Sequence, residues 1–166
     1  MSDLATYGSI ITGPDVERAV MAILEERMEE YVARMERHEG RDPKSVELPQ
    51  SFITRNDRDH WPQEMLPSVV VTSPGLSDEP KKEGDKSYRA KWAVGVGVMC
   101  GADTPTNAEA LAKFYGAAVR ECLLQHPSLE GFSEGVIWEH EKYDEIPSEN
   151  QNLFAASVIF LSLIHI

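Results

Sequence analysis

The stretch "YRAKWAVGVGVM", residues 88–99, decides the fold class of this chain of 166 residues. Large or apolar residues alternate strictly along it with smaller or polar ones. Successive side chains of a β-strand point to opposite faces of the sheet. One face therefore carries Tyr88, Ala90, Trp92, Val94, Val96 and Val98, and the other carries Arg89, Lys91, Ala93, Gly95 and Gly97. The pattern predicts a long strand with a core face that includes Trp92.

A second β-branched run precedes this strand. "SVVVTS", residues 68–73, follows Pro67 and has the composition of a short strand. A polar segment, Pro74 to Lys86, separates the two runs, so we expect an extended hairpin with a long connector. Residues 38–67 contain four prolines and predict an ordered loop. Its anchors to the core are expected to be Phe52, Ile53 and Trp61.

An amphipathic helix is predicted before the hairpin, from Pro14 to Arg37. Pro14 and Asp15 suit its first turn. Its apolar stripe consists of Val16, Val20, Ile23, Leu24, Met28, Tyr31, Val32 and Met35. Its solvated face consists of Glu17, Glu25, Glu26, Glu29, Glu30, Glu36 and several arginines. The alternative interpretation of these glutamates is an acidic wall of an assembly.

A second helix is predicted after the hairpin, capped at Thr106 or Asn107 and ended by Pro127. Its stripe consists of Ala108, Leu111, Ala112, Tyr115, Val119, Cys122 and Leu123. A weaker apolar line consists of Phe114, Ala117 and Leu124. A helix that is apolar on two sides is either deeply buried or faces both a core and a partner.

Two further strands complete the domain. They are "GVIWEHEKYDEIP", residues 135–147, and "NLFAASVIF", residues 152–160, with a polar turn between them. The order α-β-β-α-β-β predicts an α+β fold: an antiparallel four-stranded sheet with two long helices packed on one face. We expect a single domain over residues 1–160.

The charge balance and the cysteine count argue against some classes of function. The chain has 28 acidic residues against 16 lysines and arginines, a net charge of −12. Such a surface does not grip nucleic acid, although it can let DNA slide past without adhering. Two cysteines, Cys100 and Cys122, are too few for a disulfide framework and match no zinc spacing. No secretory signal is apparent, and we expect synthesis in a reducing cytoplasm.

None of the sequence's apparent motifs supports catalysis. "VGVGVMCG" has Cys100 where a dinucleotide fingerprint needs glycine, and its glycines alternate inside a strand. In "WEHE", a strand would point His140 away from both glutamates. No nucleophile elbow is present. We therefore expect no catalytic, cofactor-binding or metal-binding residues, and no enzymatic activity.

Three segments together resemble the tail terminator proteins of long-tailed bacteriophages. They are "WPQEMLPSVVVTSPGL", "GDKSYRAKWAVGVGV" and "NAEALAKFYGAAVRECLLQHPSLEGFSEGVIWEHEKYDEIP". The similarity extends from about Ile11 to Phe160 in the expected order, without a catalytic signature.

The resemblance implies a structural role in the virion, at the head-proximal end of the tail. Such proteins form a ring, usually a hexamer, that ends polymerisation of the tail tube protein and joins the head connector or stopper. DNA passes through the ring's lumen without specific binding. The connector Pro74 to Lys86 is long enough to reach a neighbouring subunit or the tube. Another neck protein, such as a head-tail stopper or completion factor, is the alternative; a small cytoplasmic enzyme is a remote one.

The chain closes on "LSLIHI", Leu161 to Ile166, where the family would continue with alternating apolar and polar or charged residues and then a polar end. The full apolar run from Asn152 is too short to span a membrane. The six residues are a direct translation of CTG-TCT-CTT-ATA-CAC-ATC, which resembles the transposon-end sequence that is used in preparing DNA sequencing libraries. We therefore expect residues 161–166 to be adapter read-through rather than native sequence.

Overall fold

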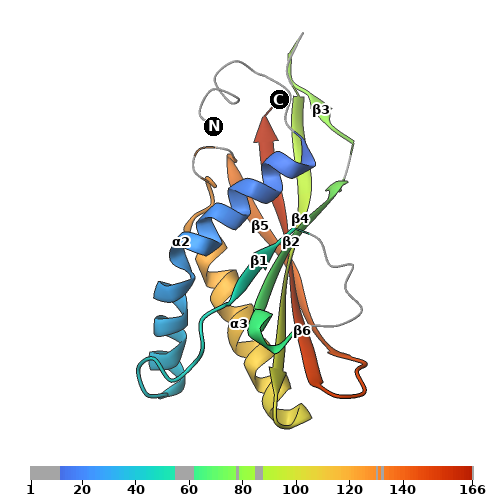
Figure 1. Ribbon diagram of the computed structural model, residues 1–166. Coiled ribbons are helices and arrows are strands. Elements are labelled where there is room, and N and C mark those ends of the chain that lie inside the picture. Colours follow the sequence, from blue (N-terminus) through green and yellow to red (C-terminus); the bar gives the residue numbers. More distant parts are fainter. Residues whose placement is uncertain are drawn as a thin grey trace.

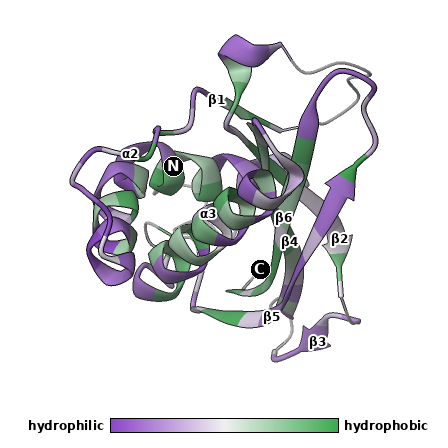
Figure 2. Cartoon of the chain, turned by 90° about the horizontal axis from the view of Figure 1, so that it is seen from below, coloured by the Kyte–Doolittle hydropathy of each residue, from purple (hydrophilic) through white to green (hydrophobic). Residues whose placement is uncertain are grey.

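A computed structural model describes residues 12–54, 62–77, 79–84, 88–129, 131 and 133–165 (Figure 1). Its helices are α2 (Gly13–Glu39), α3 (Pro105–Gln125) and a short 3-10 helix (Gln63–Met65). Its strands are β1 (Ser51–Ile53), β2 (Ser68–Leu76), β3 (Lys81–Lys82), β4 (Tyr88–Ala102), β5 (Gly135–Ile146) and β6 (Asn152–His165). The α+β class is confirmed. Both α-helices lie on the same side of one sheet (Figure 2).

The sheet has six strands in the order β1-β2-β4-β6-β5, with β3 also paired to β4. The expected hairpins β2/β4 and β5/β6 are antiparallel, but β1 runs parallel to β2. The prediction of a purely antiparallel four-stranded sheet was therefore wrong. Strand β1 has three residues inside the proline-rich segment, too few to show a period. Strand β4 extends beyond the end of β2. In this extension, Tyr88 and Arg89 pair with β3, which lies inside the polar connector.

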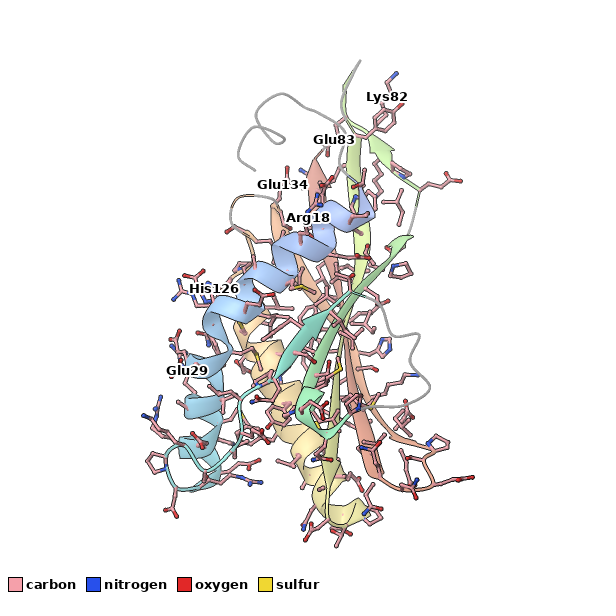
Figure 3. All side chains as sticks on the ribbon, viewed as in Figure 1. Arg18, Glu29, Lys82, Glu83, His126 and Glu134 are labelled. Atoms are coloured by element: carbon pink, nitrogen blue, oxygen red, sulfur yellow. The ribbon has the colours of Figure 1, made fainter. Side chains whose placement is uncertain are left out.

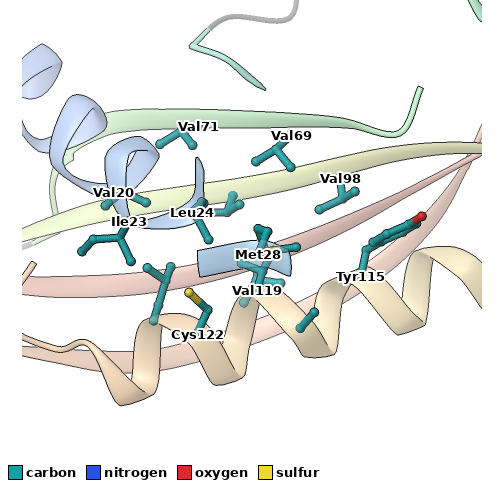
Figure 4. Packing of buried hydrophobic residues seen from close by; sticks show 14 of the residues in the cluster. Val20, Ile23, Leu24, Met28, Val69, Val71, Val98, Tyr115, Val119 and Cys122 are labelled. Atoms are coloured by element: carbon teal, nitrogen blue, oxygen red, sulfur yellow. The ribbon is translucent and has the colours of Figure 1, made fainter. Parts of the chain in front are cut away.

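The alternation along β4 places its apolar face as predicted from Ala90 to Val98, but Tyr88, the first residue assigned to that face, is 41% exposed. Ala90, Val94, Val96 and Val98 are buried under the helices, and Trp92 packs against the same core while staying partly exposed. Figure 4 shows valines from β2 and β4 in contact with α2 and α3. Burial of these branched side chains between two layers is the main stabilising term of the fold.

Helix α2 begins at the N-cap Thr12, whose backbone N–H donates to the Asp15 carboxylate over 2.9 Å. Its predicted apolar stripe is buried or packed against the core. The prediction for Glu36 was wrong, because its side chain is buried rather than solvated. It accepts backbone N–H groups of Val46 (2.9 Å) and Lys44 (3.2 Å), and these bonds lower its pKa. Glu36 thus fixes the chain that follows the helix.

Helix α3 begins two or three residues earlier than predicted. Its N-cap is Thr104, whose hydroxyl accepts the backbone N–H of Asn107 over 3.1 Å, and Pro105 occupies the first turn. The second apolar line reflects deep burial: Phe114 is 1% exposed, and the guanidinium of Arg41 lies 5.3 Å from its ring centroid. Only the end of that line, Leu124, is exposed.

Strand β6 extends beyond its predicted end at Phe160. Leu161 to His165 continue the pairing with β4, and Ser162 and Ile164 are each 1% exposed. Their composition suffices for strand pairing, so the read-through origin of residues 161–166 stays a prediction. Trp61, an expected anchor of the loop, lies outside the described residues. Among the described residues no helix is long and apolar enough to cross a membrane.

Candidate assembly surface

The glycines of "VGVGVMCG" lie in the middle of the sheet. A Cβ on Gly95 would lie 3.1 Å from the Thr72 hydroxyl of β2, and one on Gly97 would lie 3.6 Å from the Ala156 carbonyl of β6. They therefore leave room for neighbouring strands, and no helix opens at them as a dinucleotide site needs.

Among the described residues, His140, Cys100 and Cys122 form no reactive cluster. His140 is level with Ile159 on the uncovered face, whereas Glu141 is level with Val158 on the helix-facing side. Burial raises the pKa of both thiols, Cys100 and Cys122, to about 12, so both stay protonated. Within the described part of the chain, no three His, Cys, Asp or Glu side chains gather to hold a metal.

The face of the sheet opposite the helices carries a shallow groove. It has a volume of about 300 Å³ and is lined by β2, β4, β5 and β6. Its floor is made of small residues such as Gly95, Gly97 and Ala155. Lys142 and Asp144 of β5 line the same groove and lie 3.6 Å apart. The described residues that line it include one carboxylate, Asp144, and two hydroxyl side chains, Thr72 and Ser157.

A second apolar cluster lies at one end of this uncovered face. It consists of Leu66, Val70, Met99 and Leu153, with Ile53, Ile146 and Ala155 packed against it. The four residues that form this cluster are each less than 10% exposed, so the cluster is a second small core of the subunit.

Strand β5 forms one edge of the described sheet. It exposes two large apolar side chains, Ile137 (43%) and Trp138 (45%), on opposite faces. The guanidinium of Arg120 lies 5.1 Å from the Trp138 ring centroid and pairs with Glu141 over 3.0 Å. Tyr143 donates its hydroxyl to the same carboxylate. These contacts tie the helix-facing half of β5 to α3 and leave its outer edge free to pair.

The opposite edge of the sheet is protected along most of its length. The backbone N–H of Ser73 donates to the Glu17 carboxylate of α2 over 3.0 Å. Glu17, which was predicted to lie on the solvated face, is therefore partly buried and bound to β2. Pro74 follows, inside a bulge between Thr72 and Gly75. Beyond it, β3 exposes Lys81 and Lys82, and Figure 3 shows Lys82 at the tip of the molecule. The proline and the bulge therefore protect the edge along β2, whereas β3 beyond them is an exposed basic strand.

The acidic face of α2 is largely solvated, as predicted. Glu25, Glu26 and Glu29 are exposed, and Glu30 pairs with Arg34 over 2.7 Å. Figure 3 shows Glu29 on the outer side of the helix layer, away from the sheet.

Comparison with known proteins gives a distant structural likeness. No family model matches the chain, and no curated protein does. A solved structure described as "Virion of native gene transfer agent (GTA) particle" contains a similar chain, with 14% sequence identity and a TM-score of 0.48. The match covers 82% of this chain and 93% of that one. A likeness this weak supports no inference about function.

Proposed function

We propose that the protein is a structural component of a phage-type virion, and specifically a tail terminator. In this role its subunits form a ring, a hexamer by the resemblance, that caps the tail tube and offers a joining surface to the head connector. The role is one of assembly and requires no catalytic residue or cofactor.

The observation that carries the proposal is the extended sequence resemblance from about Ile11 to Phe160. It follows chain order through both helices and the main strands. The geometry is consistent with it, because the helices cover one face of the sheet and leave a groove on the other face and two exposed apolar side chains, Ile137 and Trp138, on the β5 edge. Exposed apolar surface of this kind favours contacts between proteins.

The charge of the chain is consistent with a passage for DNA. At a net charge of −12, a closed ring of several copies would repel a phosphate backbone rather than bind it. The exposed glutamates of α2, Glu25, Glu26 and Glu29, would add to that repulsion wherever they faced a lumen.

Electron microscopy of the purified protein tests the proposal. We expect rings, and we expect tail tubes incubated with the protein to stop growing and to carry a ring at one end. Tubes that continue to grow in the presence of excess protein, with no ring at either end, would exclude a terminator.

A further inference from the structure

We propose that copies of this chain join edge to edge, with the basic strand β3 of one copy beside the acidic strand β5 of the next. This inference deepens the proposed ring and rests on it. Its partner is a second copy of the same chain.

The two edges of the sheet carry opposite charge. Strand β5 contains four acidic residues and one lysine, in "GVIWEHEKYDEI". Along the other edge, β1 ("SFI") and β2 ("SVVVTSPGL") contain no charged residue, and β3 contains two lysines. Opposite charges across an interface favour association and fix its register.

The individual charges that would meet are exposed and available. Glu139 lies in the bulge of β5, between Trp138 and His140, and has no register partner in β6. Lys81 and Lys82 are also exposed. The structure shows no ion pair from any of these three charged side chains to another described residue. The acid that follows them, Glu83, points back to Arg89 of its own sheet at 3.2 Å.

Strand direction permits the pairing. Strand β5 runs in the same direction as β4, and β3 runs opposite to β4. A copy placed beside β5 in the same orientation therefore brings its β3 antiparallel to β5. Such a contact joins two different surfaces, and repeating it closes into a ring when the rotation allows. A two-fold contact of β5 with itself would instead bring like charges together.

Sterics and charge require the same displacement along the strands. With no displacement, β1 of the second copy would occupy the place of β5, because β1 lies outside β2. The last residue of β1, Ile53, is level with Gly97 of β4. The last residue of β5, Ile146, is level with Gly101 of β4. A shift of five or more residues therefore carries β1 past the end of β5.

Charge matching gives almost the same shift. Lys81 is level with Arg89 of β4, and His140, next to Glu139, is level with Gly95. Bringing Lys81 to Glu139 needs a shift of about six residues, roughly 20 Å. Over four strand spacings of about 4.8 Å, this corresponds to a strand tilt of about 45° to the ring axis, similar to that of closed barrels.

Charge reversal and re-pairing test the contact. The variants are Lys81→Glu with Lys82→Glu, Glu139→Lys, and all three changes together, with subunit dissociation measured by sedimentation and native mass spectrometry. We expect each reversal to raise the dissociation constant at least about tenfold and the combination to restore it to within about threefold. Circular dichroism checks that each variant is folded.

The matched control is Glu145→Lys. Glu145 is exposed on the same strand, but at this displacement it faces the uncharged β2 of the next copy. We expect a change of less than about threefold. High salt should raise the dissociation constants of wild type and of Glu145→Lys by about the same factor.

The outcomes separate this contact from the proposed function. Rings that persist in both reversed variants, or that break with Glu139→Lys but not with the lysine changes, would overturn the edge contact and leave the terminator proposal standing. Failure of the combined variant to re-form rings while folded would also overturn the contact. A wild-type protein that forms no rings and caps no tubes would overturn both.

Discussion

Replacement of Trp92 tests how β4 is packed. Trp92 lies on the core face of β4 but is only partly buried, and its indole Nε1 is buried without a hydrogen-bond partner in the described structure. An aromatic side chain buries about 150–250 Å² when it is enclosed, so partial burial removes roughly 100 Å² from water. At about 25 cal/mol per Å², this contributes about 2.5 kcal/mol.

The unpartnered N–H offsets part of that gain. A buried donor without an acceptor costs about 1–3 kcal/mol. Trp92→Ala should therefore lower the free energy of unfolding by no more than about 1.5 kcal/mol. Trp92→Phe keeps most of the apolar contact and removes the donor, so its stability should lie within about 1 kcal/mol of wild type.

Urea unfolding followed by circular dichroism measures these differences. Phe160→Ala is the reference, because Phe160 is 1% exposed and such a truncation costs about 3–5 kcal/mol. If Trp92→Phe lost more than about 2 kcal/mol, the indole N–H would have to be satisfied in solution, and the reasoning would be refuted. A loss for Trp92→Ala equal to that of Phe160→Ala would mean that Trp92 is fully enclosed.

Three further predictions concern charges and thiols. Reversing Glu29 and Glu30 to arginine should change the free energy of unfolding by less than about 1 kcal/mol, since both are exposed on α2; loss of the folded state in circular dichroism would contradict this. The pKa of Glu36 lies below its ordinary value of 4.5, so its contribution is present above that value and is lost as pH falls through the folded pKa. The urea midpoint of wild type should thus fall more steeply between pH 6 and pH 3 than that of Glu36→Gln, and parallel curves would show that the carboxylate contributes nothing. Cys100 and Cys122 should not react with a thiol reagent in native buffer and should both react in urea, because both are fully buried; rapid native labelling would contradict that burial.

The local elements of the fold could be predicted from the sequence because their patterns are long. The stripes of α2 and α3 and the alternation of β4 each run over several periods, and burial follows them closely. The short strands were not predicted, because they contain too few residues to show a period. Strand β3 is two lysines in a polar connector, and its pairing depends on β4 being longer than β2.

Individual polar residues were misplaced where a tertiary partner decided their environment. By helical period Glu36 falls on the solvated side of α2, yet the returning chain at Val46 covers it and supplies its donors. Likewise Glu17 meets Ser73, which is distant in sequence. A periodicity describes one helix and contains no information about what crosses its far side.

The sequence by itself determined the α+β class, the two buried helical faces, the two antiparallel hairpins and the acidic balance, because each depends on local period or composition. Only the tertiary structure decided the order of strands in the sheet. That order leaves acidic β5 at one edge and basic β3 at the other. It therefore places Trp138 and Glu139 on an edge strand, where both are exposed. Edge position depends on which strands pair over long separations, and that choice is made by packing of the whole chain rather than by any one segment.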